Sequence, residues 1–164
     1  MAEIIKECFL VDLDTGDKLE FPSTPEEITD SAGAEWTDIL VLGRSEPIRA
    51  WGSTNARKIG YTFQFQATED VRGDVYNKVK WLQSLEYPTY AAGIAHRPPV
   101  LMLIMGSFMR FRCIARPAID VRWQPPWELP TMFPMVAEVS MNLEAVSRIP
   151  LAATDVRRGL WTHG

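Results

Sequence analysis

The sequence has few of the residues on which most metal and catalytic sites depend. Of its 164 residues, only two are cysteine and two are histidine. A structural zinc site needs four clustered cysteine or histidine ligands, whereas Cys8 and Cys113 lie far apart in the chain. We therefore expect no metal centre and two reduced, buried thiols. A disulfide between them is the less favoured alternative, because it requires adjacent strands.

Long apolar segments are also missing. The longest fully apolar run is Val100 to Met105, far short of the roughly 20 residues that a membrane-spanning helix needs. The stretch from Met1 to Glu7 has no basic region followed by an apolar one, so we expect neither a signal peptide nor membrane insertion. The motifs GxSxG, HExxH, GxGxxG and the P-loop do not occur. We expect no enzymatic activity, no catalytic residue and no bound cofactor.

Acidic residues outnumber basic ones, and the two signs are separated along the chain. The net charge is −4 at pH 7, which disfavours a general nucleic-acid-binding protein, because such proteins are basic. Residues 1–47 carry 12 acidic and 3 basic side chains, whereas residues 48–164 carry 9 and 14. Two interpretations stay open: chance placement on a solvated surface, or contact between the acidic part of one copy and the basic part of another.

Alternating apolar and polar residues predict a protein built mainly of β-strands. The clearest alternation spans residues 57–67. Further strand-like stretches cover residues 4–11, 31–42, 47–51, 100–105, 108–121 and 134–146. Hairpin-type links dominate, so the strands should be mostly antiparallel, and six or seven of them suggest a β-sandwich or a small barrel.

One amphipathic helix interrupts these strands. Between residues 69 and 86 the apolar side chains of Val71, Val75, Val79 and Leu82 recur at spacings of 4, 4 and 3. This spacing places them on one face of a helix of about 15 residues. The helix should cap an open edge or end of the strand assembly.

Three segments lack a period. Residues 87–97 are expected to be a loop, and residues 123–133 form a second loop rich in aromatic residues and proline. An aromatic loop either covers its own core or contacts another protein; we favour the contact, because aromatic residues and methionine are enriched at interface cores. Residues 1–148 should form a single domain, with residues 149–164 as a C-terminal tail that orders on a partner.

Arginine and aromatic side chains supply the candidate contact residues. Four arginines cluster along the strand predicted at residues 108–121 and just beyond it. They can meet acids of a neighbouring subunit, protect a sheet edge or, least favoured at this net charge, bind phosphate. The residues predicted at a subunit or partner interface are Trp36, Arg110, Arg112, Arg116, Trp123, Trp127 and Phe133.

Several different short stretches follow one another along the chain in an order typical of a known family. They are Phe21-Pro22-Ser23-Thr24-Pro25-Glu26-Glu27-Ile28, Ala34-Glu35-Trp36 with Gly43 and Pro47-Ile48, the strand at 57–67 running into the helix, Arg97-Pro98-Pro99-Val100 with Gly106, and Pro134 to Val139 leading into Leu143-Glu144. In this order the chain resembles the tube-type proteins of contractile injection systems and long phage tails, most of all the baseplate tube-initiator or hub-adaptor members. The resemblance covers roughly residues 19–146. Met105 stands where the family usually has an aromatic residue, and the usual Asp-Gly before the final strand is absent.

The resemblance implies a tail-tube-like β fold whose copies join edge to edge in a homo-hexameric ring. DNA would pass through the central channel as cargo only. The channel wall should be polar or acidic so that DNA slides, and Thr62, Gln64 and Gln66 are the candidates for it. Tail tube, hub or spike, and baseplate wedge proteins would be the partners. The protein would reside in the baseplate of a virion tail after assembly in the host cytoplasm.

Three functions follow from these expectations. The leading one is a structural ring of a contractile tail baseplate that connects the tail tube to the central hub or spike. The alternative within the same family is the major tail tube subunit. From a different class, a small β-barrel would bind an apolar ligand in a cavity lined by Tyr61, Phe63 and Phe65.

Overall fold

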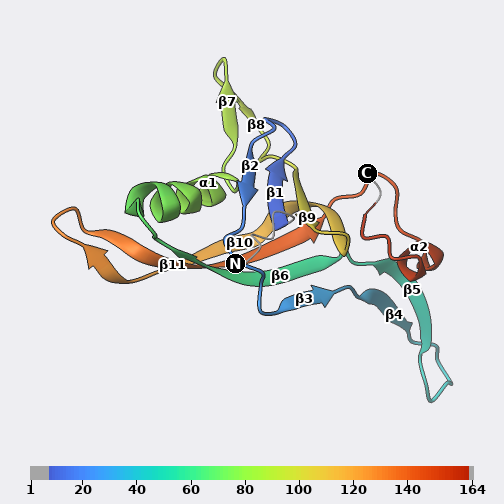
Figure 1. Cartoon of the computed structure of the whole chain (residues 1–164). Helices are drawn as coiled ribbons and strands as arrows, with labels where there is room; N and C mark the ends of the chain where they lie inside the picture. Colours follow the sequence, from blue (N-terminus) through green and yellow to red (C-terminus); the bar gives the residue numbers. More distant parts are fainter. Residues whose placement is uncertain (1–7, 163–164) are drawn as a thin grey trace.

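The computed structural model describes residues 8–162, which form one seven-stranded sheet and two smaller hairpins (Figure 1). Neighbouring strands in the large sheet are antiparallel and follow the order β2-β1-β9-β10-β11-β6-β3. The strands are β1 (Cys8–Asp12), β2 (Lys18–Glu20), β3 (Ile28–Ser31), β6 (Lys58–Gln66), β9 (Leu101–Met105), β10 (Met109–Glu128) and β11 (Phe133–Ala145). The prediction of a mainly antiparallel β protein is confirmed. The first four residues of the strand predicted at 4–11, and His163, lie outside the described residues.

Strand β6 shows why the sheet has one apolar and one polar face. Ile59, Tyr61, Phe63 and Phe65 are buried, and the polar residues between them are exposed. Successive side chains of a strand point to opposite faces of the sheet, so this alternation places one set in the core and the other in solvent. The neighbouring strand β11 is in matching register with β6 and repeats the pattern.

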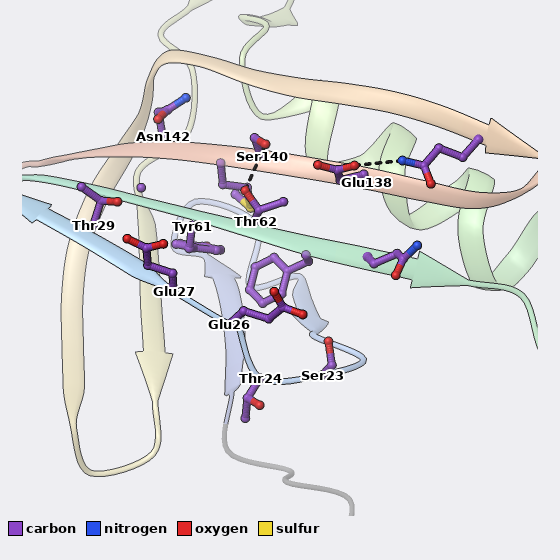
Figure 2. Close-up of a pocket in the computed structure, with 15 residues that line it drawn as sticks. Ser23, Thr24, Glu26, Glu27, Thr29, Tyr61, Thr62, Glu138, Ser140 and Asn142 are labelled. Carbon is purple, nitrogen blue, oxygen red and sulfur yellow. Dashed lines mark hydrogen bonds between the residues drawn. The ribbon is translucent and has the colours of Figure 1, made fainter.

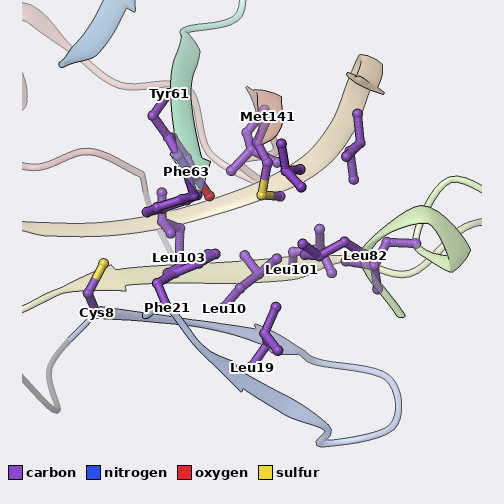
Figure 3. Packing of buried hydrophobic residues seen from close by; sticks show 14 of the residues in the cluster. Cys8, Leu10, Leu19, Phe21, Tyr61, Phe63, Leu82, Leu101, Leu103 and Met141 are labelled. Carbon is purple, nitrogen blue, oxygen red and sulfur yellow. The ribbon is translucent and has the colours of Figure 1, made fainter. Parts of the chain in front are cut away.

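Aromatic packing across the core shows that the sheet curls (Figure 3). The ring of Phe21, just after β2, stacks on Phe63 of β6 with ring centroids 4.0 Å apart, and meets Tyr61 edge-on at 5.9 Å. Strand β2 is one edge of the sheet, and β6 lies next to the opposite edge, β3. The two ends of the sheet therefore face each other across the core. Among the described residues, no strand pairs with the outer side of β2 or β3.

The predicted helix covers residues 72–84 and begins with a wider turn. A π-helical segment, η1 (Arg72–Asn77), continues directly into α1 (Lys78–Ser84). Val75, Val79 and Leu82 are fully buried against the sheet, as their spacing predicts. Asp74 accepts hydrogen bonds from the backbone N–H and hydroxyl of Thr68 and from the N–H of Glu69, and these bonds lower the pKa of its carboxyl group.

The prediction of a loop at residues 87–97 is wrong, because this segment forms a hairpin. Strands β7 (Thr89–Ala91) and β8 (Ile94–His96) pair antiparallel. Ala92 and Gly93 between them both have positive φ, at 52° and 77°. Two successive residues with positive φ are what a tight two-residue hairpin turn requires. The usual sequence for such a turn is Asn-Gly or Asp-Gly, so Ala92-Gly93 gave only a weak signal.

The prediction of an aromatic loop at residues 123–133 is also wrong. Strand β10 continues through Glu128, the chain turns at residues 129–132, and β11 begins at Phe133. Proline lacks a backbone N–H and is tolerated in sheets mainly where the pairing is irregular. Pro125 and Pro126 lie in a register shift between Gln124 and Trp127. The prolines themselves are unpaired, and regular pairing of β10 with β11 resumes at Trp127.

A second small hairpin extends away from the large sheet (Figure 1). Among the strands that the structure describes, β4 (Ala34–Ile39) and β5 (Ile48–Thr54) pair only with each other. Of the residues in these two strands, only Ala50 is even partly buried. We call residues 34–54 the arm. Its strands were expected at 31–42 and 47–51, but nothing in their pattern indicated that they would lie outside the main sheet.

A core substitution measures how much the curled sheet depends on its packing. Leu103 of the central strand β9 is fully buried in the apolar cluster. Leu103→Ala should lower the free energy of unfolding by ~2–5 kcal/mol through lost burial and an unfilled cavity, as measured by chemical denaturation. Leu13→Ala, at a side chain that is 44% exposed, is the control and should change it by less than about 0.5 kcal/mol. Equal effects of the two substitutions would contradict this core.

Candidate assembly surfaces

A polar hollow of about 760 Å³ opens on the solvent face of the sheet (Figure 2). Its floor is formed by β6 and β11, which contribute Thr62, Gln64 and Ser140, and one wall by the segment that carries Glu26 and Glu27. The strand alternation that buries the aromatic side chains of β6 also points these polar side chains outward. The lining is therefore mainly hydroxyl, amide and carboxylate groups.

Side chains on this face bind one another. The hydroxyl oxygens of Thr62 and Ser140 lie 3.1 Å apart, and the Gln124 amide donates to a Glu138 carboxylate oxygen at 2.9 Å. Arg122 approaches the same carboxylate at 3.8 Å. These contacts link the neighbouring strands β6, β11 and β10. Polar side chains on this face therefore find hydrogen-bonding and ionic partners on the same face.

The three residues predicted for a channel wall lie on this face. Thr62, Gln64 and Gln66 are all exposed and alternate with the buried side chains of β6. The structure therefore brings them together in one row, next to Ser140 and Glu138 of β11. Their role in a channel stays a prediction.

Apolar side chains on the arm are exposed to an unusual degree. Trp36 and Trp51 lie opposite each other in the register of β4 and β5 and are 60% and 58% exposed. At the tip, Leu40 and Leu42 are almost fully exposed. An exposed apolar patch of this kind is typical of a protein contact site. Sequence reasoning identified Trp36 alone; the apolar run at residues 39–42 suggests a buried strand when its partner is unknown.

The predicted contact arginines have different surroundings. Arg110 is exposed, whereas Arg112 is half-buried. Arg116 lies 3.5 Å from the carboxylate of Glu144 on β11. This ion pair joins β10 to β11, which are inner strands in the order of the sheet. A contact of any of these arginines with a neighbouring subunit stays a prediction.

The predicted contact aromatics are divided between the core and the surface. Trp123 and Phe133 pack against Tyr76 of η1, with ring centroids 6.1 and 5.1 Å apart. Trp127, further along the β10–β11 hairpin, is 43% exposed, and Leu129 and Met132 of the turn are more exposed still. The base of the hairpin is thus held to the helix, while its tip presents apolar side chains to solvent.

Both cysteines are buried and free, as predicted. Cys8 pairs with Met105 at one end of β9, whereas Cys113 pairs with Leu101 at the other, so strand β9 separates them. Burial raises the pKa of the Cys113 thiol far above its ordinary range, against a smaller opposing effect of a hydrogen bond from the Leu103 backbone. Burial also raises the pKa of Tyr61.

Within residues 8–162, no three or more histidine, cysteine, aspartate or glutamate side chains gather in a group that could hold a metal ion. Among the helices of the same residues, none is long and apolar enough to cross a membrane.

Comparison with known proteins finds a distant structural likeness. No protein-family model matches the chain, and no curated protein matches it. The structure is similar to a chain in the virion of a native gene transfer agent particle, with a TM-score of 0.43 and 12% identity. It is similar to a chain in the tail of an empty gene transfer agent particle with C6 symmetry, with a TM-score of 0.43 and 13% identity. Each match covers 93% of this chain and 100% of the other.

The buried Cys113 thiol should make the protein less stable in alkali. The unfolded thiol ionises near pH 9, whereas the folded thiol stays neutral well above this pH. Stability from the neutral thiol is therefore fully present below pH 9 and is lost as the pH rises further. Cys113→Ala should make the free energy of unfolding fall less steeply above pH 9 than in the wild type, in denaturation series across this range. Identical slopes would contradict the raised pKa.

Proposed function

We propose that the chain is a structural subunit of a phage-type tail and that copies of it join edge to edge in a ring. The observation that carries this proposal is the open seven-stranded sheet, whose edge strands β2 and β3 pair on one side only within residues 8–162. Unpaired backbone donors and acceptors at an edge are a ready template for another strand. Pairing of β2 in one copy with β3 in the next satisfies both of these edges, and repetition around a closed ring leaves neither of them exposed.

The polar face supplies the channel wall of such a ring. Edge-to-edge joining continues the polar face from one copy to the next. In the proposed ring this face lines the central channel. A wall of hydroxyl, amide and carboxylate groups, as around Thr62, Gln64 and Glu138, repels or weakly contacts the phosphates of passing DNA. Six copies and a DNA channel follow from the resemblance to tail tube proteins.

The projecting hairpins support a place in the baseplate, between the tail tube and the hub or spike. The arm, the β7–β8 hairpin and the tip of the β10–β11 hairpin leave the sheet separately (Figure 1). Each carries exposed apolar side chains, such as Leu42, Tyr90 and Leu129. A ring that joins unequal partners, including baseplate wedge proteins, needs several separate contact segments. The protein would act by docking in the virion tail rather than by catalytic turnover, after assembly in the host cytoplasm.

The major tail tube subunit is the second candidate within the same fold. The exposed apolar arm favours this candidate if the arm binds an identical ring above or below, because tube subunits stack in rings. Copy number separates the two: one ring per particle for an adaptor, and many stacked rings for a tube subunit.

The packing of the core argues against the third hypothesis, in which a small β-barrel binds an apolar ligand. The rings of Tyr61, Phe63 and Phe65 are almost fully buried, and Phe21 packs on the first two. The space that a ligand would occupy is therefore filled by the protein's own side chains.

Charge at the arm tip tests its role in assembly. Leu40→Asp combined with Leu42→Asp should abolish the stacking of one ring on another and leave the ring joined through β2 and β3 intact, because the carboxylates would have to be desolvated in an apolar contact at the arm. Light scattering and electron microscopy of the purified protein measure this. The fold should survive, since both side chains are already exposed. Leu13→Asp is the control at an exposed leucine elsewhere; equal stacking of rings by both variants would rule out the arm.

Lysines on the polar face test the channel. With Thr62, Gln64 and Gln66 all replaced by lysine, assembled rings should retain DNA in a salt-dependent manner, because each cation releases counterions from phosphate. A gel-shift titration of wild-type and variant rings measures it. The control carries lysines at Thr89, Tyr90 and Ile94 of the β7–β8 hairpin. Equal DNA retention by the two variants would show that the polar face is not the channel wall.

A further inference from the structure

The C-terminal segment forms a loop that begins and ends at the same residue. The N–H of Val146, just after β11, donates to the carbonyl oxygen of Arg112 at 3.0 Å. The N–H of Arg112 donates to the hydroxyl oxygen of Thr162 at 3.0 Å. Residues 147–161 lie between these two contacts, and we call residues 147–162 the C-terminal loop. Figure 1 shows it at the end of the molecule opposite to the tip of the β10–β11 hairpin.

The middle of the C-terminal loop contributes little to the core. It contains one short helix, α2 (Ala153–Arg157), with no buried residue. Ile149, Val156 and Leu160 are 63%, 48% and 41% exposed. Ordering these residues costs conformational entropy that apolar burial within the loop does not repay.

The end of the loop is anchored far better than its middle. The Trp161 indole lies edge-on to Phe108 with centroids 5.4 Å apart, and its N–H donates to the Phe108 carbonyl at 3.1 Å. The guanidinium of Arg57 lies 4.1 Å from the Trp161 ring centroid. Arg57 also binds Asp30 of the edge strand β3 through two hydrogen bonds. The anchor site therefore adjoins the sheet edge at which the next copy docks in the proposed ring.

We propose that the C-terminal loop is exchanged between copies, so that Trp161 and Thr162 of one subunit occupy the Phe108–Arg112 site of the next. This inference rests on the proposed ring. Exchange keeps the same aromatic and hydrogen-bonding contacts and changes only the path of the weakly held middle, which makes it a low-cost route to association. The 14 residues between Val146 and Trp161 can span roughly 46 Å when extended. Such a strap would hold neighbouring subunits together beyond the pairing of their strands.

Isotope-coded photocrosslinking tests the exchange. The variant Trp161→p-benzoylphenylalanine keeps an aromatic ring at the anchor and forms a covalent link to its neighbours on illumination. Unlabelled and ¹⁵N-labelled monomers of this variant are mixed before assembly, and crosslinked peptides are then analysed by mass spectrometry. In rings, links from position 161 to residues 108–112 should join labelled with unlabelled peptides in about half of the pairs; in isolated monomers they should join peptides of one label only. Trp127→p-benzoylphenylalanine is the control and should give no link to residues 108–112.

The possible results separate this inference from the proposed function. Rings in which residues 108–112 are linked only to position 161 of the same label, or not linked to it at all, would overturn the exchange and leave the ring intact. A chain that forms no ring under any condition would overturn the proposed function together with the inference. As a second readout, Trp161→Ala should raise the concentration needed for half-maximal assembly roughly tenfold while leaving the far-ultraviolet circular dichroism of the monomer unchanged. An unchanged assembly concentration would contradict the exchange.

Discussion

Unpaired backbone at the two edges of the large sheet is the constraint on which the other features depend. Strands β2 and β3 are short, with three and four residues, and in the part of the chain that the structure describes each has a partner on one side only. Lys18 and Glu20 on β2, and Asp30 on β3, add charge to these edges. Charged residues at an edge discourage unspecific pairing. Short, charged edges can therefore accept a specific partner, such as the complementary edge of another copy, and resist indiscriminate aggregation.

The alternation of side chains along β6, which β11 follows from Ala137 to Leu143, gives this open sheet one apolar and one polar face. One face is closed by aromatic packing, with Phe21 reaching from one end of the sheet to Phe63 near the other. The opposite face is covered by side chains that bind each other, such as Thr62 with Ser140. Because the curl is fixed by the core, the polar face has a defined shape, and in the proposed ring this shape would continue from copy to copy as a wall.

Much of this architecture could be predicted from local patterns. The 4, 4, 3 spacing from Val71 to Leu82 identified the helix, and the alternation of residues 57–67 identified both the buried and the polar face of β6. The burial of Cys8 and Cys113 followed from their apolar strands. These features depend on residues close together in sequence, and hydrophobic periodicity reports on such residues directly.

What could not be predicted depends on contacts between distant residues. The run Ile39 to Leu42 has the composition of a buried strand, and nothing local shows that the arm has no sheet to cover it. The packing of Trp123 and Phe133 on Tyr76 could not be predicted, because Tyr76 lies about 50 residues away in the helix. Pro125 and Pro126 indicated a loop, since the register shift that accommodates them is a property of two strands together.

Electron cryo-microscopy of the purified protein over a range of concentrations tests the central claim most directly. The expected result is a closed ring in which β2 of each copy hydrogen-bonds to β3 of the next, with Thr62 and Gln64 on the inner wall. Persistent monomers with both edges free, or a ring whose copies meet through other surfaces, would contradict it.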